Sequence, residues 1–182
     1  MSVLPVTTYE QALIALRSQL LTYTDIPGRM IINGDSLYGP DVWRELSDTI
    51  GVAPDIDTPF IVFEFKEIQN EIFGITTDAD GMFAVAPYGF FIKIYGNKCH
   101  EVAYKVSSIF KFPSVVESLQ NAGIKIVSAS QVSSLNEFIN NIRWPRCDVE
   151  IDVACNFEVP ISDPNDPGYA ESIAQPIKVI DI

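Results

Sequence analysis

The feature that most constrains this chain is a strictly alternating segment, residues 147–159. Its odd positions are all apolar: Cys147, Val149, Ile151, Val153, Cys155, Phe157 and Val159. Its even positions are polar or small. Because successive strand side chains point to opposite faces, this pattern predicts one long β-strand with one buried face and one polar face. At roughly 3.3 Å per residue the strand would extend about 43 Å, well beyond an ordinary strand.

The polar face of this segment carries four carboxylates, Asp148, Glu150, Asp152 and Glu158. Isolated buried charges are costly, so these side chains are expected to face water or a wet cavity. Polar strand faces are commonly plain solvent faces, and that interpretation stays open beside a second one, in which the acidic row lines something. Same-face neighbours lie about 6.6 Å apart, which would suit a glycosidase pair, but a regular row of four indicates a surface.

Composition limits the function classes. The chain has 182 residues, 47% of them hydrophobic, which suits one domain with a single core. No apolar run approaches the roughly 20 residues that span a bilayer, and no secretory signal is visible at the N-terminus. A net charge of −12, from 24 acidic and 12 basic residues, opposes tight binding to nucleic-acid phosphates. The three cysteines are interpreted as small buried apolar residues in a reducing compartment.

The periodicity of the remaining chain alternates between helix and strand. Helices are expected over residues 8–22, after Asn97, and after Pro113. Thr7 or Thr8 would cap the first, with Thr7 and Glu10 at capping-box spacing; Asn97 and Ser114 would cap the others, and Gly123 would end the last. Strands are expected over residues 29–33, 60–68, 83–95 and 124–129, and residues 70–77 could pair with the 83–95 strand.

These elements predict an α+β fold, a mixed and mainly antiparallel β-sheet with an N-terminal helix and one or two further helices packed on it. Residues 1–160 form the single domain, and residues 161–182 a Pro-rich C-terminal extension whose strand-like end could pair with a sheet edge. Residues 34–59 are interpreted as either a partner-contact loop or a surface insertion. A second irregular segment, residues 130–141, would be anchored by Leu135, Phe138 and Ile142.

No residue set points to catalysis, a cofactor or a metal. Asp78 and Asp80 resemble the start of a calcium loop, but the later ligands are misplaced, and Asp80-Gly81 favours a hairpin turn. Cys99 and the single histidine, His100, would point about 100° apart on a helix, which disfavours a nucleophile pair. The cysteine spacings do not match zinc ligands, and no Gly-rich phosphate loop is present.

The order of elements resembles a known family. A helix containing residues 12–17 (Ala-Leu-Ile-Ala-Leu-Arg) comes first, followed by a Pro-flanked strand at 59–65 and a strand that ends at Tyr95-Gly96 before a helix. Trp144-Pro145-Arg146 then opens the long alternating strand. This arrangement, over roughly residues 8–159, resembles the tail terminator (tail completion, neck) proteins of long-tailed bacteriophages.

The resemblance implies a structural virion protein without catalytic residues or cofactors. It implies a homo-hexameric ring on the last ring of the tail tube that contacts the tail tube protein and the head-connector or head-completion protein, with the sheath as a further candidate partner. DNA would pass through the lumen as cargo, no membrane is involved, and the protein would reside in the virion tail or neck after assembly in the host cytoplasm. Asp148, Glu150, Asp152 and Glu158 would then face the lumen or another wet surface, where an acidic wall would keep DNA from adhering.

Two alternatives stay open. One is another head–tail connector, head-completion or tube-associated protein of similar size. The other is a non-phage binding module or small enzyme acting on a cationic ligand, which would be a monomer or dimer with a concave pocket.

Overall fold

The computed structural model describes residues 8–34, 55–66, 74–78, 81–139 and 142–159. Its helices are α1 (Tyr9–Tyr23), a 3₁₀ turn (Gly28–Met30), α3 (Cys99–Ile109) and α4 (Pro113–Asn121). Its strands are β1 (Ile31–Asn33), β2 (Phe60–Lys66), β3 (Gly74–Asp78), β4 (Gly81–Tyr95), β5 (Ile124–Ala129), β6 (Ser133–Ile139) and β7 (Ile142–Val159). The predicted α+β class is confirmed.

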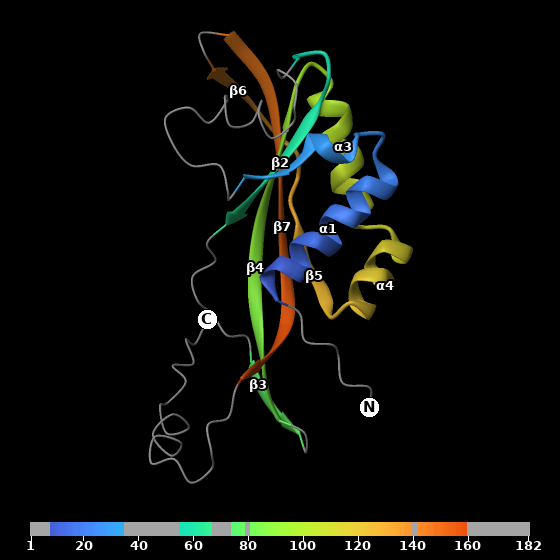
Figure 1. The fold of residues 1–182 in the computed structure, drawn as a ribbon, viewed down its shortest axis with the longest axis vertical. Helices are drawn as coiled ribbons and strands as arrows, with labels where there is room; N and C mark the ends of the chain where they lie inside the picture. Colours follow the sequence, from blue (N-terminus) through green and yellow to red (C-terminus); the bar gives the residue numbers. More distant parts are fainter. Residues whose placement is uncertain (1–7, 35–54, 67–73, 79–80, 140–141, 160–182) are drawn as a thin grey trace.

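The seven strands form one sheet in the order β1-β2-β4-β7-β5, with β3 paired to β4 and β6 paired to β7. Among these described strands β1 and β2 run parallel, and every other pairing is antiparallel. The long strands β4 and β7 pair from Met82–Val159 to Tyr95–Arg146 and form the spine of the molecule (Figure 1). The alternating segment is therefore a strand, as predicted, and it lies at the centre of the sheet rather than at an edge.

The helices α1, α3 and α4 cover the same face of the sheet (Figure 1). The core lies between them and the apolar positions of the central strands. Phe90, Ile92 and Ile94 of β4 are fully buried, and so are the matching β7 positions Cys147, Val149, Ile151 and Val153. The helices contribute Leu16, Leu20, Val106 and Val115 to the same core. This arrangement explains the alternation in β7, because its odd positions meet the helices and its even positions point to the other face.

Thr8, one of the two predicted cap residues, caps α1. The predicted capping box of Thr7 and Glu10 is wrong, because Thr8 forms the box with Gln11. Asn97 does not cap α3; its amide instead donates a 2.7 Å hydrogen bond to Asp57, and Lys98 precedes the helix without a side-chain cap.

At α4 the predicted Ser114 cap is also wrong. Phe112 is the N-cap residue and Pro113 occupies the first turn, where its missing N–H costs nothing. The expected left-handed residue after α4 is confirmed, since Gly123 has φ +78°.

Residues 133–139 form strand β6, although the sequence predicts an irregular segment there. That prediction rests on the many serine and other polar residues of the segment. The strand pairs with the first part of β7 from Ser133–Asp148 to Ile139–Ile142 and extends β7 to 18 residues. Leu135, Phe138 and Ile142 are 43%, 74% and 56% exposed, so the prediction that they anchor this segment in the core is wrong. The hairpin projects from one end of the sheet (Figure 1).

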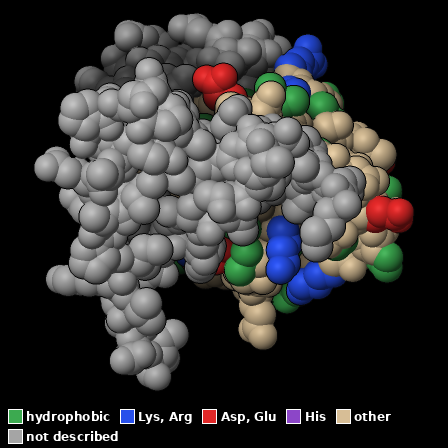
Figure 2. Space-filling model, turned by 90° about the horizontal axis from the view of Figure 1, so that it is seen from below, with side chains coloured by type: hydrophobic (Ala, Val, Ile, Leu, Met, Phe, Trp, Pro, Cys, Tyr) green, Lys and Arg blue, Asp and Glu red, His purple; other side chains and the backbone are tan. Residues whose placement is uncertain are grey.

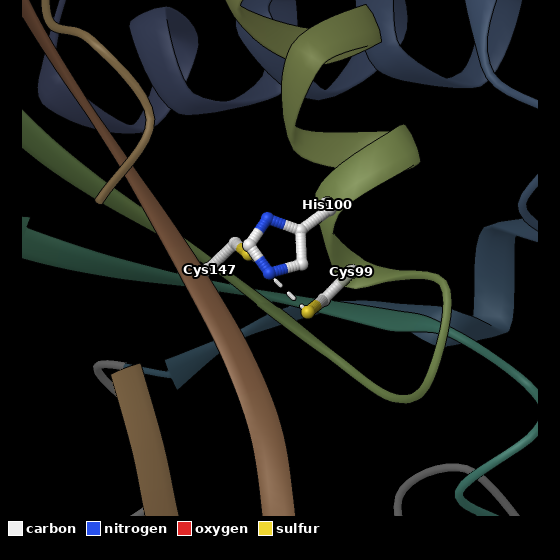
Figure 3. A group of neighbouring side chains, drawn as sticks. All are labelled: Cys99, His100 and Cys147. Atoms are coloured by element: carbon white, nitrogen blue, oxygen red, sulfur yellow. Dashed lines mark hydrogen bonds between the residues drawn. The ribbon is translucent and has the colours of Figure 1, made fainter. Parts of the chain in front are cut away.

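Helix α3 contacts the spine through two cysteines. Cys99, in the first turn of α3, places its Sγ 3.2 Å from the Sγ of Cys147 on β7, and the ring of His100 lies beside the pair (Figure 3). Both thiols are buried, as is Cys155 further along β7, and all three cysteines are free. The prediction of buried cysteines is confirmed, but the meeting of Cys99 with Cys147 does not follow from their positions in the sequence.

The Asp78–Gly81 pairing closes the β3–β4 hairpin and agrees with the hairpin interpretation of that turn. Residues 35–54 of the predicted contact loop and the 161–182 extension lie outside the described residues. Within the described ranges, no helix has the length and hydropathy needed to cross a membrane. Seen from below, the described surface carries acidic, basic and hydrophobic side chains interspersed (Figure 2).

Candidate functional site

The sheet face opposite the helices carries a cluster of charged side chains, which we call the charged face. It consists of Glu64 and Lys66 on β2, Lys93 on β4, Glu137 on β6, and Arg146, Asp148, Glu150 and Asp152 on β7. The strand register brings them together, since β7 places Asp148 opposite Lys93 and Glu150 opposite Phe91 on β4. On the other side of β4, the register sets Glu64 of β2 opposite the same Phe91.

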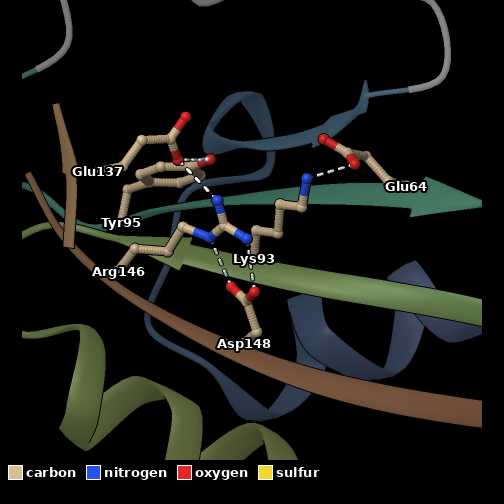
Figure 4. Close-up of polar contacts among 6 residues, drawn as sticks. All are labelled: Glu64, Lys93, Tyr95, Glu137, Arg146 and Asp148. Carbon is tan, nitrogen blue, oxygen red and sulfur yellow. Dashed lines mark hydrogen bonds and ion pairs between the residues drawn. The ribbon is translucent and has the colours of Figure 1, made fainter. Parts of the chain in front are cut away.

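Arg146 is the hub at one end of the charged face (Figure 4). Its Nε and Nη2 donate to the two carboxylate oxygens of Asp148 at 2.7 and 2.6 Å, which is bidentate geometry. Its Nη1 donates to Glu137 at 2.7 Å, and the Tyr95 hydroxyl donates to the same Glu137 oxygen at 2.9 Å. The guanidinium also lies 5.8 Å from the centre of the Tyr95 ring. One cation thus holds together three strands, β4, β6 and β7.

The other two cations bind carboxylates of other strands: Lys93 on the neighbouring strand, Lys66 across the width of β4. Lys93 forms an ion pair with Glu64 across β4 and β2 (Figure 4). Lys66 lies 2.7 Å from a carboxylate oxygen of Glu150 and 3.6 Å from one of Asp152, so it spans the two. The second Asp152 oxygen accepts a 2.7 Å hydrogen bond from Ser128 on β5.

Three shifted pKa values describe the chemistry of the charged face. The hydrogen bonds to Asp148 are the main cause that raises the pKa of the Arg146 guanidinium. The hydrogen bond to Glu150 is the main cause that raises the pKa of Lys66. Burial, followed by the charge of Glu137, raises the pKa of the Tyr95 phenol. Each shift fixes the ordinary protonation state at neutral pH, the reverse of what general acid–base catalysis requires.

Three of the four carboxylates predicted on the long strand have defined surroundings. Asp148 is buried at 8% exposure, while Glu150 and Asp152 are half-buried. Glu158 lies within β7, but its side chain falls outside the described part of the structure. The charged face contains five carboxylates and three cations, so its formal net charge is −2. The orientation of these carboxylates toward a lumen stays a prediction.

Sequence reasoning missed the cations of the charged face. Lys66 and Lys93 follow the same period-two signal in their own strands, where each alternates with apolar residues. That signal predicts that each lysine points away from the core. It does not predict the pairing, because the strand register is needed to place Lys66 beside Glu150, 84 positions later in the chain.

Exposed hydrophobic side chains gather in two further places. The β6–β7 hairpin exposes Leu135, Phe138 and Ile142. On the helical side, Ile14 of α1 and Tyr104 of α3 are 67% and 64% exposed. Exposed apolar side chains therefore occur on both the β6–β7 hairpin and the helical side of the described surface.

Comparison with known protein families identifies a match that covers most of the chain. A family model described as "Phage neck terminator protein" matches residues 36–181, most of the 182-residue chain. The match includes β2 to β7 and therefore the whole charged face. No curated protein matches the chain.

Proposed function

Because the chain belongs to the phage neck terminator protein family, and is thus a structural component of the phage neck, we propose that it forms a closed ring that ends the tail tube. The ring is a homo-hexamer that joins the tube to the head connector, and genomic DNA passes through its lumen. The family match over residues 36–181 is the observation that carries this proposal. The resemblance to tail terminators in the order of elements is confirmed at the level of the family.

A closed ring requires a heterologous interface, in which one patch of a subunit meets a different patch of the next. The exposed apolar side chains support this requirement, because they lie on different elements: Leu135, Phe138 and Ile142 on the hairpin, and Ile14 and Tyr104 on α1 and α3. The edge strand β5 adds a third surface, on which Val127 is 52% exposed. Edge strands can also pair between subunits.

We place the charged face toward the lumen or a wet surface of the ring. Its net charge is negative, and the whole chain carries −12, so it lacks the excess of cations that binds phosphate backbones. DNA would therefore slide past Glu150 and Asp152 rather than adhere. The ion pairs to Lys66 hold these carboxylates in place, which suits a fixed channel wall.

The ring acts by assembly, not by turnover, and it needs no cofactor. Its partners are the tail tube protein on one side and the head-connector or head-completion protein on the other, with the sheath as a further candidate. It assembles in the host cytoplasm and stays in the virion neck. A different position in the neck, as a head-completion or tube-associated protein, is the second candidate. It is supported less, because the family description names a terminator.

Light scattering coupled to size exclusion, followed by electron microscopy, tests the proposal. We expect the purified chain to form rings of six subunits at high concentration, or on addition of tube protein. Purified tubes capped by the chain should stop growing at that end. Uncapped growth, together with a particle that stays monomeric both alone and with tubes, would contradict the terminator assignment.

The hairpin gives a more specific expectation. Phe138→Ser combined with Ile142→Ser removes two exposed apolar side chains, so folding should be nearly unchanged. If the hairpin contributes to the subunit interface, the loss of about 1–2 kcal/mol of apolar burial should weaken assembly roughly 10-fold. Light scattering over a concentration series measures this shift. Gln120→Ser, an exposed polar site on α4 outside these surfaces, is the control for a surface change without loss of apolar area.

A further inference from the structure

Three side chains with metal-ligating atoms converge where α3 meets β7. They are Cys99 and His100 in the first turn of α3 and Cys147 on β7, and their ligand atoms all lie within 4.8 Å of one another (Figure 3). The two sulfurs are 3.2 Å apart. Sequence spacing does not predict this cluster, because Cys147 is 48 positions from Cys99 and no zinc-ligand spacing is present.

The sulfur–sulfur distance is close to that of a tetrahedral thiolate–imidazole site. With Zn–S near 2.3 Å and Zn–N near 2.0 Å, tetrahedral geometry separates the ligand atoms by about 3.5–3.8 Å. The sulfurs would need to separate by only about half an ångström to reach that range. The ligand atoms lie within 4.8 Å of one another, so the imidazole would also have to approach the sulfurs to about 3.5 Å. Rotation of the Cys99 and His100 side chains, at the helix end, would provide both changes.

The surroundings provide an entry path from the solvent. Both cysteines are buried, whereas His100 is exposed, so the cluster reaches from the core to the surface. The exposed Ser134 on β6 lies 3.3 Å from His100 Nε2, on the same side. Two thiolates also neutralise a divalent cation, which avoids placing a net charge near the core.

We propose that Cys99, His100 and Cys147 bind one thiophilic divalent cation, for which Zn²⁺ is the best fit among the common metals. Two cysteine thiolates and one imidazole form a recognised zinc ligand set, with the fourth position left to water. Binding replaces the two thiol protons by the cation, so one Zn²⁺ enters and two protons leave. The bound ion ties the beginning of α3 to β7, and it does so in each subunit whether or not the ring forms.

Titration of the untagged, full-length protein tests this proposal. The chain is purified with a phosphine reductant, which keeps Cys99 and Cys147 reduced, then stripped with a chelator and titrated with Co²⁺ and Zn²⁺. We expect one equivalent to bind, with sulfur-to-cobalt charge-transfer absorption and the visible bands of tetrahedral Co²⁺. Zn²⁺ at about 100 times its Kd should raise Tm by roughly 5–10 °C. The affinity should fall with falling pH because binding releases protons.

Single substitutions test whether Cys99, His100 and Cys147 are the metal ligands. His100→Ala changes an exposed residue, so the protein should fold, and its affinity should fall by more than the roughly 10–100-fold that the loss of an outer-shell partner costs. Cys147→Ser should abolish the charge-transfer band from that sulfur. Cys155→Ser, a buried cysteine of the same strand outside the cluster, is the matched control and should bind as the unmodified chain does. Absence of one-equivalent binding, or equal affinity in His100→Ala, would overturn the proposal.

Discussion

Arg146→Ala is expected to destabilise the protein by about 3–5 kcal/mol. The substitution leaves Asp148, only 8% exposed, without the two guanidinium hydrogen bonds that it accepts, and removes one donor from Glu137. Removing one partner of a buried ion pair costs much more than replacing both partners by apolar residues, because it leaves an uncompensated buried charge. For a chain of this length the loss corresponds to a fall in Tm of roughly 10 °C or more, measurable by calorimetry or by urea unfolding.

Arg143→Ala is the matched control for this prediction. Arg143 lies three positions earlier in the same strand, is exposed, and donates a 2.9 Å hydrogen bond to Asn136. Its loss should cost less than about 0.5 kcal/mol. The double variant Arg146→Ala with Asp148→Asn should recover part of the stability, because it removes the orphaned charge. Equal effects of Arg146→Ala and Arg143→Ala would show that the pair with Asp148 contributes nothing beyond a surface contact.

The ion pairs of the charged face also matter for the proposed function of the neck protein. A row of carboxylates that was merely solvated would repel itself and would hold no fixed shape. Here Glu150 is bound to Lys66, Glu64 to Lys93 and Asp148 to Arg146, so the anionic side chains are fixed in position by cations of the same sheet. Such a face can remain negative overall and still be rigid. Both properties suit the proposed passage of DNA.

Sequence patterns predict the parts of the fold that depend on local periodicity. Residues 147–159 alternate without a break, so their identity as a strand follows from side-chain direction alone. The helix at residues 9–23 and the strand at 124–129 are similarly evident. Strand β6 escapes prediction because Ser133, Ser134 and Asn136 are residues that favour turns, and pairing with β7 is what makes the segment extended.

The candidate sites depend on register, which local patterns do not encode. The acidic positions of β7 are evident, but the basic partner of Glu150 comes from β2 and lies 84 positions away. The Cys99–Cys147 contact likewise arises from the packing of α3 on the sheet. In both cases the residues are recognisable by type, and what cannot be derived is which of them meet.

Phe90→Ala is expected to cost about 3–5 kcal/mol, whereas Phe91→Ala, one position later, should cost only about 1 kcal/mol. Phe90 is fully buried on the helical face of β4, where the ring of Tyr9 stacks at 5.4 Å. Phe91 points to the charged face, is half-buried, and has Lys66 Nζ 5.8 Å from its ring centre.

The two substitutions remove the same atoms from adjacent positions. The difference between them therefore measures how well each face of β4 is packed. Urea unfolding of both variants, at a concentration where the subunit is monomeric, measures the difference as a shift in midpoint at constant slope. A larger effect at Phe91 would mean that the charged face, not the helical one, forms the better-packed layer. That outcome would contradict both the assignment of the core and the exposure of the carboxylates to a wet surface.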